Sequence, residues 1–193
     1  AMRTDVREFR LSDIFEALQR EFEGPARSKG LRLTVVPSSV SLRSDPRLLR
    51  RVLQNLVSNA IKYTPRGRIL MGCRRVGDHC RIEVHDTGLG IPENRRAVIF
   101  REFERLQQSD NEPGLGLGLS IVERIAEMLE HPLTLKSTHG EGSMFAITVQ
   151  RGTSLPKARS AAQVQRTRSV PQLAGARVLV ADNEAAILEG MRS

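Results

Sequence analysis

Aromatic residues and long apolar runs are scarce in this sequence. It contains no tryptophan, and aromatic residues make up 4% of its 193 residues. It therefore offers few side chains on which the bases of single-stranded nucleic acid could stack. No run approaches the roughly 18 apolar residues that cross a membrane as a helix. The opening residues AMRTDVREFR lack the apolar core of a secretory signal. The sequence thus predicts no membrane segment and no signal peptide.

Cysteine is also rare, with two residues in the chain, Cys73 and Cys80. They flank a predicted hairpin that turns at Gly77 and Asp78. If residue 75 pairs with 80, and 73 with 82, the thiols share one face but lie on a diagonal, about 7 Å or more apart. That separation disfavours a disulfide. We therefore expect two reduced, core-facing thiols in a cytoplasmic protein.

Acidic residues are absent from one long segment. Six basic residues and no acid lie between Arg151 and Arg177, within a chain whose net charge is +8. The composition predicts a domain over 1–150, a basic flexible linker over 151–176 and a short C-terminal element over 177–193. Nucleic-acid binding by this segment is one alternative. It would show as an affinity that falls steeply with salt and survives deletion of residues 1–150. We predict no nucleic-acid partner.

Hydrophobic periodicity predicts helices and strands that do not alternate strictly, which is typical of an α+β fold. We expect a two-layer α/β sandwich with helices on one face of a mixed sheet. Ser12 is expected to cap a first helix that ends near Gly24 and Pro25, and Asp45 and Pro46 to open a second. The remaining predicted elements are strands at 31–36, 40–42, 68–76, 79–85, 133–138 and 144–149, a short helix from Glu93 and a long helix at about 117–129.

The first chemical motif is QNLVSNAIKYT, residues 54–64, on the second helix. Asparagine is a poor helix former, yet Asn55 and Asn59 lie four residues apart, and Lys62 follows three further on. All three project from one side of the helix, beside its apolar stripe. Amide oxygens suit Mg²⁺, and a lysine on the same side can neutralise phosphate oxygens. A solvated helix face is the alternative explanation for this motif taken alone.

The second motif, HDTGLGI at residues 85–91, directly follows a predicted strand. Asp86 can accept a hydrogen bond from an exocyclic amine such as that of adenine. Gly88 and Gly90 let the backbone approach a flat base closely. A simple turn is the alternative, and the spacing does not complete the dinucleotide-binding fingerprint.

The third motif, GLGLGLSIV at residues 114–122, opens the last long helix. Gly114, Gly116 and Gly118 free successive backbone N–H groups, and the N-terminus of the helix behind them carries partial positive charge. Together these features favour a phosphate-binding loop over a flexible hinge.

The order and spacing of these motifs resemble the ATP-binding domain of sensor histidine kinases, within the gyrase, heat-shock-chaperone, histidine-kinase and mismatch-repair ATPase superfamily. The resemblance covers about residues 4–150, including the Phe-Arg-Glu-Phe element at 100–103, and implies a Bergerat-type ATP-binding fold with a mobile lid over 104–117. It also implies ATP and Mg²⁺ as ligands. Asn55 and Asn59 would hold the metal, Lys62 and Arg105 would reach the phosphates, and Asp86 would bind adenine. The implied ATP site also includes Tyr63, Gly88, Gly90, Ile91, Phe103, Gly114, Leu115, Gly116, Leu117, Gly118 and Leu119.

One position separates kinases from ATPases in this superfamily. Members that hydrolyse ATP carry a glutamate general base four residues before the metal-binding asparagine. Here that residue is Asn55, and an amide cannot take a proton from water. The resemblance therefore implies transfer to a protein histidine, and an ATP-hydrolysing member of the superfamily is the alternative. A decayed, non-catalytic interaction module is a second alternative. It is disfavoured because Asn59, Lys62, Asp86 and the three glycines are all present.

The stretch ARVLVADNEAAILEGM, residues 176–191, resembles the start of a response-regulator receiver domain. In that family two acidic residues after the first strand hold Mg²⁺. Here Asp182 is retained and Asn183 replaces the second acid. We expect this truncated start to be inactive and either disordered or loosely docked, because an isolated βα fragment cannot bury its apolar face.

A histidine kinase also needs a phosphoacceptor histidine on a dimerising helical hairpin. None of the four histidines, at 79, 85, 131 and 139, fits such a hairpin, so we expect structural roles for them. The resemblance then implies a phosphoacceptor domain outside this chain, with a receiver domain or response regulator downstream. We predict a monomer, which analytical ultracentrifugation tests.

Overall fold

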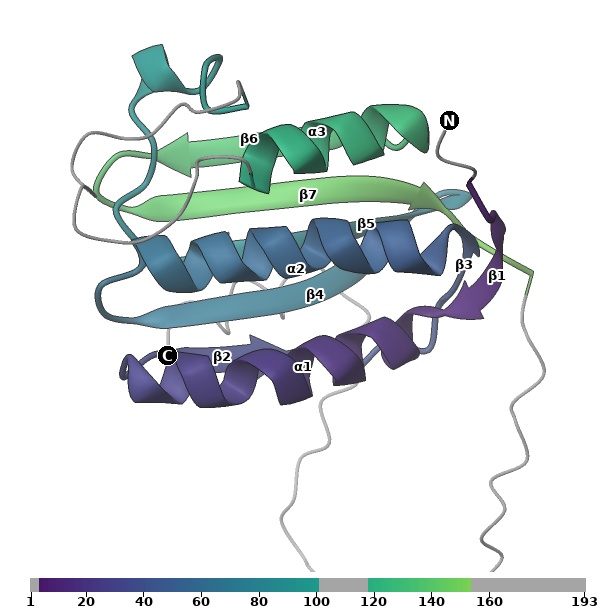
Figure 1. Ribbon diagram of the computed structural model, residues 1–193, viewed down its shortest axis with the longest axis horizontal. Coiled ribbons are helices and arrows are strands. Elements are labelled where there is room, and N and C mark those ends of the chain that lie inside the picture. The colour runs from purple at the N-terminus through teal and green to yellow at the C-terminus, as the bar shows by residue number, and fades with distance from the viewer. Residues whose placement is uncertain (1–3, 101–117, 154–193) are drawn as a thin grey trace, which may run out of the picture.

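The computed structural model describes residues 4–100 and 118–153. Three helices and two sheets form two layers, with the helices on one face of the larger sheet (Figure 1). The α+β sandwich expected from the sequence is confirmed. The described residues do not include the predicted lid (104–117), the segment 154–176 or the receiver-like segment 177–193. Gly118, which directly follows the lid, is described. No described helix combines the length and apolar character needed to cross a membrane.

The larger sheet has five strands in the order β2-β4-β5-β7-β6. Strands β2 and β4 are parallel, and the remaining neighbouring pairs, β4–β5, β5–β7 and β7–β6, are antiparallel. The mixed sheet thus agrees with the expectation, and both predicted hairpins form, as β4–β5 and β6–β7. The strands are β2 (Arg32–Val35), β4 (Arg68–Val76), β5 (His79–Asp86), β6 (Leu133–Thr138) and β7 (Gly142–Gln150).

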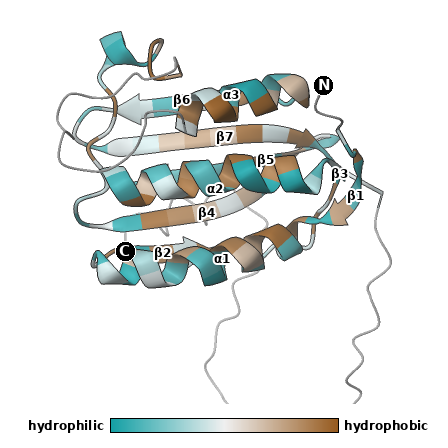
Figure 2. Cartoon of the chain, in the orientation of Figure 1, coloured by the Kyte–Doolittle hydropathy of each residue, from teal (hydrophilic) through white to brown (hydrophobic). Residues whose placement is uncertain are grey.

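The core lies between the sheet and the helices α1 (Leu11–Ser28), α2 (Pro46–Tyr63) and α3 (Gly118–Met128). Helix α2 lies centrally in this layer and turns its apolar stripe toward the strands, whose central residues are hydrophobic (Figure 2). Leu49, Val52 and Leu53 of this stripe are fully buried. Each such side chain contributes about 1.5–3 kcal/mol through removal of apolar surface from water.

A second, two-stranded sheet closes one end of the domain. It pairs β1 (Arg7–Arg10) with β3 (Ser41–Ser44) in antiparallel fashion. The sequence analysis did not identify β1, because its alternation of charged residues with a single phenylalanine is a weak strand signal. Residues 151–153 attach to this end: Gly152 N donates to Ser41 O at 2.8 Å, and Thr153 Oγ1 donates to Glu8.

Two predictions about α1 are wrong. The helix is capped at Arg10 without a side-chain hydrogen bond, because Leu11 N, following directly on β1, donates to Val40 O at 3.0 Å. Ser12 lies inside the first turn. The helix also continues through Gly24 and Pro25 to Ser28. Burial of Ala26 favours the last turn, and the chain leaves the helix at Gly30, whose φ of +72° suits glycine.

The hairpin register places the cysteines as predicted. Cys73 pairs with Ile82, and Arg75 pairs with Cys80. Neither cysteine forms a disulfide, and Cys73 Sγ lies 3.1 Å from Ser38 Oγ. The neighbouring Cys73 thiol and burial raise the pKa of Cys80, so this thiol stays protonated at neutral pH.

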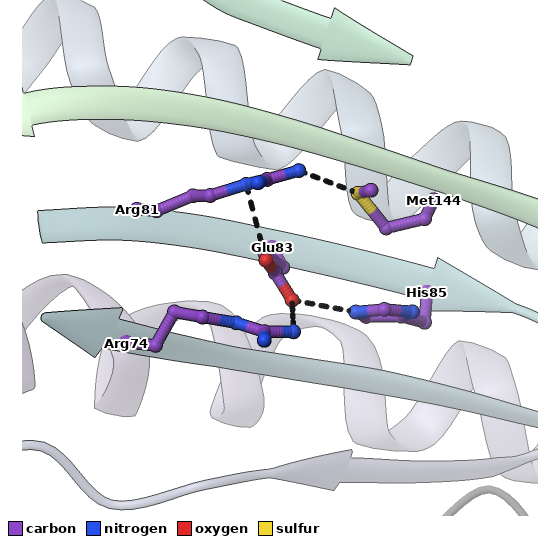
Figure 3. Close-up of polar contacts among 5 residues, drawn as sticks. All are labelled: Arg74, Arg81, Glu83, His85 and Met144. Atoms are coloured by element: carbon purple, nitrogen blue, oxygen red, sulfur yellow. Dashed lines mark hydrogen bonds and ion pairs between the residues drawn. The ribbon is translucent and has the colours of Figure 1, made fainter. Parts of the chain in front are cut away.

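The opposite face of the sheet contains a buried carboxylate, Glu83, which is 1% exposed (Figure 3). Its Oε2 accepts hydrogen bonds from Arg74 Nη2 at 2.8 Å and His85 Nε2 at 2.9 Å. Arg81 Nε forms an ion pair with Oε1 at 3.1 Å. Burial acts to raise the pKa of Glu83, but the hydrogen bonds from His85 and Arg74 and the Arg74 charge outweigh it and hold the pKa at about 2. Glu83 therefore connects β4 to β5 and stabilises the residues of β5 that precede Asp86.

Asp45 explains why α2 begins where the sequence predicts. Its carboxylate accepts hydrogen bonds from Arg47 N at 2.9 Å and Leu48 N at 3.2 Å. It also accepts one from Asp5 N at 2.8 Å. We expect Asp45→Ala to lower the free energy of unfolding by about 1–2 kcal/mol, because these buried donors lose their acceptor. Urea unfolding measures this effect. Exposed Asp13→Ala is the control, and an equal loss in both variants would contradict the capping role.

Candidate nucleotide-binding site

The asparagine side chains of α2 face the start of α3. A Cβ atom added at Gly118 would lie 3.2 Å from Asn55 Oδ1 and 3.6 Å from both amide atoms of Asn59. Asn55 Nδ2 donates to Arg51 O at 2.8 Å, and this bond sets the orientation of the amide. The structure thus brings two amides against the N-terminus of a helix, where backbone N–H groups and the helix dipole favour anions.

Asp86 ends β5 on the helix side of the sheet and is 8% exposed. Its Oδ1 accepts a hydrogen bond from Gly88 N at 2.8 Å, and its carboxylate accepts another from the backbone of Ser143. Burial raises the pKa of Asp86. These hydrogen bonds and the charge of His85 offset only part of that effect. A buried carboxylate at a strand end is a strong acceptor for a donor brought by a ligand.

Gly88 lies where the turn after β5 meets the end of α2. An added Cβ would collide with Tyr63 O and would lie 2.8 Å from both Asp86 Oδ1 and Thr64 Oγ1. Thr64 is fully buried, and its Oγ1 has no hydrogen-bond partner within the described part of the chain. An unsatisfied buried hydroxyl beside a buried carboxylate fits a ligand that carries both donors and acceptors, such as a purine base.

Thr64 is a site residue that sequence reasoning did not select. The only available signal was its position, directly after Tyr63 at the end of the asparagine motif. Its proximity to Asp86, which is 22 positions further along the chain, arises from tertiary packing. Lys62 Nζ lies 5.3 Å from the centroid of the Tyr63 ring, in cation–π contact. Lys62 and Tyr63 thus lie together at the end of α2.

Of the remaining predicted site residues, some are described by the structure and others lie outside the described residues. Gly90, with φ of +64°, packs against the backbone of Thr138 at the end of β6. Ile91 is buried, and its N donates to Ser137 Oγ at 2.7 Å. These two residues anchor the turn to the hairpin, while Leu119 is half-buried on α3. Other predicted site residues lie outside the described residues: Phe103, Arg105, Gly114, Leu115, Gly116 and Leu117.

Two histidines have structural partners. His85 binds Glu83, and His131 Nε2 lies 2.7 Å from Ser44 Oγ, which ties the end of α3 to β3. Burial lowers the pKa of His131, so its neutral form is favoured. His79 and His139 are exposed beside the two hairpin turns. The contacts of His85 and His131 fit the structural roles expected for them, whereas the roles of His79 and His139 stay predictions.

Comparison with known proteins identifies the family. Residues 44–153 match the family model described as histidine kinase-, DNA gyrase B-, and HSP90-like ATPase. The circadian input-output histidine kinase CikA of Synechococcus elongatus is 34% identical over 145 residues, which cover 74% of this chain and 18% of that protein. The virulence sensor protein BvgS of Bordetella bronchiseptica is 35% identical over 182 residues, which cover 87% of this chain and 14% of that protein. The chain thus spans less than a fifth of these relatives.

Solved structures agree with the assignment. Full-length ShkA in complex with AMPPNP matches with a TM-score of 0.71 and 26% identity, covering 79% of this chain and 32% of that one. The nucleotide-free catalytic domain of histidine kinase ThkA matches with a TM-score of 0.65 and 25% identity, covering 76% of this chain and 96% of that one. Together with the amides at the start of α3 and the buried Asp86, these matches show that the chain belongs to the histidine kinase-, DNA gyrase B-, and HSP90-like ATPase family, as the ATP-binding catalytic domain of a sensor histidine kinase.

Proposed function

We propose that this domain binds ATP with Mg²⁺ and transfers the terminal phosphoryl group to a histidine on a separate dimerisation domain. The observation that carries the proposal is the placement of two amides, Asn55 and Asn59, against the N-terminus of α3. Amide oxygens are suitable Mg²⁺ ligands, and the adjacent helix start favours phosphate groups. Bound Mg²⁺ would neutralise phosphate charge, which is the main requirement of phosphoryl transfer.

The other residues complete a nucleotide site. Asp86 accepts the exocyclic amine of adenine, and Thr64 Oγ1 bonds a second polar atom of the base. Gly88 leaves room for the base, since a side chain there would collide with the backbone of Tyr63. Lys62 and Arg105 reach the phosphates. Tyr63, Gly90, Ile91, Phe103 and Leu119 flank the nucleotide. The lid residues Gly114, Leu115, Gly116 and Leu117 close over its phosphates, and Gly118 contributes from the start of α3.

The chemistry at Asn55 favours a kinase over an ATPase. Its Nδ2 is engaged by Arg51 O, which leaves Oδ1 on the side of Gly118. An amide in this position can hold a metal or its water, but it cannot accept a proton from an attacking water. The histidine nucleophile therefore comes from a partner domain, and the enzyme positions ATP for it.

The proposed partners follow from this chemistry. They are the phosphoacceptor dimerisation domain and a receiver domain or response regulator, and a cytoplasmic location gives access to ATP. The BvgS match covers 87% of this chain, more than residues 1–153 can supply, so it includes residues outside 1–153. We propose that residues 177–193 begin a receiver domain and that the isolated chain is monomeric.

Substitution of Asn59 tests the metal site. We expect Asn59→Ala to weaken Mg·ATP binding by at least about tenfold, because one metal-orienting oxygen is lost. With Mg²⁺ chelated, the variant and the unsubstituted chain should bind ATP alike. Isothermal titration calorimetry measures both affinities, with neighbouring, exposed Ser58→Ala as the control. An equal loss of affinity without Mg²⁺ would contradict metal binding by Asn59.

Phosphate release distinguishes the two reactions. We expect the chain alone to release little phosphate from ATP, because it lacks both a general base at Asn55 and the histidine acceptor. Steady hydrolysis that Asn59→Ala abolishes would instead assign an ATPase. A coupled phosphate assay under saturating ATP measures this rate.

A further inference from the structure

A cavity lies away from the asparagine residues, lined by residues of α1, β2 and the segment that joins α2 to β4. Figure 1 shows where α2 passes into β4. Its volume is about 780 Å³, which is within the usual range for small-molecule sites. None of Asn55, Asn59, Asp86 or Gly118 lines it, so it is separate from the nucleotide site. The lining residues are Arg27, Gly30, Leu31, Arg32, Gly67, Arg68 and Thr87.

The lining is strongly cationic. Arg27 comes from the last turn of α1, Arg32 begins β2 and Arg68 begins β4, so three separate elements bring their arginines to one cavity. No carboxylate is among the described residues that line it. Nearby Lys29 is used elsewhere, since its Nζ donates to Ile61 O at 3.0 Å and Lys62 O at 2.6 Å at the end of α2. The charged residues that line the cavity, among those described, are therefore Arg27, Arg32 and Arg68.

The chemistry of the lining favours phosphate. A planar guanidinium donates two parallel hydrogen bonds to phosphate oxygens, and several guanidinium groups around one cavity suit a multiply charged anion. Arg27 and Arg32 are exposed at the mouth, while Arg68 is half-buried. Leu31 and the glycines add an apolar surface without bulk. The space is larger than a single phosphate needs, so it fits a phosphate-bearing small molecule.

This cavity borders the turn after β5, because Thr87 of that turn is one of its lining residues. Arg68 N donates to Thr87 Oγ1 at 3.0 Å, and Thr87 N donates to Arg68 O at 3.2 Å. Arg32 N donates to Gly67 O at 3.1 Å. Thr87 lies between Asp86 and Gly88, which both belong to the proposed adenine site. A ligand that binds Arg32 and Arg68 and moves them closer together would therefore shift Thr87 and, with it, these two residues.

We propose that this cavity, the arginine cavity, binds a phosphate-bearing small molecule and that its occupancy changes adenine affinity through Thr87. The coupling rests on the proposed nucleotide site, whereas the binding does not. Binding at the arginine cavity is detected by NMR shifts of the Gly30 and Gly67 amides. Binding at the nucleotide site is detected by shifts of the Gly118 and Asn59 amides. Failure of one site can therefore be distinguished from failure of the other.

The test is an NMR titration of the 193-residue chain with pyrophosphate in the absence of Mg²⁺. We expect the amide resonances of Gly30, Gly67 and Thr87 to shift and saturate together. The double variant Arg27→Ala, Arg32→Ala should need at least about tenfold more pyrophosphate, because two guanidinium groups that donate charged hydrogen bonds to phosphate are removed. The variant Arg20→Ala, Arg124→Ala removes the same charge from exposed positions on α1 and α3 and should bind like the unsubstituted chain.

Two results would overturn binding: no shift at Gly30 and Gly67, or an equal loss of affinity in the Arg20, Arg124 variant, which would indicate non-specific attraction to a basic surface. AMP, titrated separately, distinguishes a nucleotide from a bare phosphate group. If AMP shifts Leu31 and Gly30 at lower concentration than pyrophosphate, the ligand is a nucleotide; if pyrophosphate acts at lower concentration, the phosphate groups alone are recognised. Unchanged thermal unfolding of both double variants shows that they are folded.

Coupling is measured with adenosine, which has no phosphate. We expect pyrophosphate to change the adenosine dissociation constant by about fivefold in the unsubstituted chain. The Arg27, Arg32 variant keeps the nucleotide site and should lose this change. Persistence of the change in the variant would show that pyrophosphate acts from the nucleotide site itself and would overturn the coupling.

Discussion

Replacing Asp86 with asparagine is expected to reduce ATP affinity by about 100-fold, because the buried carboxylate is the proposed acceptor for the exocyclic amine of adenine. An amide oxygen is a weaker acceptor. If its oxygen keeps the hydrogen bond from Gly88 N, its NH₂ group also faces the exocyclic amine, which is a donor. Isothermal titration with ATP measures the loss, and exposed Asp78→Asn is the matched control. Unchanged ATP affinity in Asp86→Asn would remove Asp86 from the site.

The same substitution should not destabilise the fold at neutral pH. Burial raises the pKa of Asp86 above its ordinary value of 3.8, so folding favours the protonated form. The free energy of unfolding therefore falls as pH rises through the folded pKa, and a neutral amide avoids this cost. Thermal unfolding of the variant at pH 7 should occur at or above the temperature of the unsubstituted chain. This result would separate lost binding from lost structure.

Replacing Glu83 with glutamine is expected to have the opposite profile: a large loss of stability with little effect on ATP affinity. Glu83 lies on the sheet face away from the helices and contacts Arg74, Arg81 and His85 (Figure 3). Removing its charge leaves the guanidinium groups of Arg74 and Arg81 around a neutral, buried amide. We expect the free energy of unfolding at pH 7 to fall by about 3 kcal/mol, which corresponds to the pKa shift from 4.5 to about 2.

The pH dependence identifies the cause. The folded pKa of Glu83, about 2, lies below its ordinary value of 4.5. Its stabilising effect is therefore complete above the ordinary pKa and is lost as pH falls through the folded pKa. The difference in the free energy of unfolding between the unsubstituted chain and Glu83→Gln should narrow to about 1.4 kcal/mol at pH 3. Urea unfolding at pH 7 and pH 3 measures it, with exposed Glu127→Gln as the control. A gap that stays constant with pH would contradict the ionic explanation.

These two carboxylates show how one strand divides its functions. Alternate residues of β5 face opposite sides of the sheet, so Asp86 lies toward the helices and Glu83 lies on the other face. His85 lies between them in sequence and bonds Glu83. The charged cluster of Glu83 holds the end of β5 in place without occupying the nucleotide site. Binding and stability can therefore be altered separately in this strand.

Some features were predictable because they depend on neighbours in the sequence. Asp45 begins α2 because its side chain accepts hydrogen bonds from backbone N–H groups of the first turn. Pro46 suits the first helical position because it has no N–H group that would need a partner. The β4–β5 hairpin register follows from its tight turn, which places the cysteines on a diagonal. The asparagine spacing on α2 places both amides on one side of that helix. The start of α1 was mispredicted because its first N–H bonds Val40 O, a partner 29 positions away.

The sequence by itself determined most of the helices and strands, the family and the nucleotide motifs, because helix periodicity, strand alternation and motif spacing are local patterns. Only the tertiary structure decided what those elements bring together. It placed Thr64 beside Asp86, assigned Gly90 to packing against β6, buried Glu83 among cations and collected Arg27, Arg32 and Arg68 around one cavity. The physical reason is that burial, pKa and cavity shape depend on contacts between segments far apart in the chain, which no local pattern specifies.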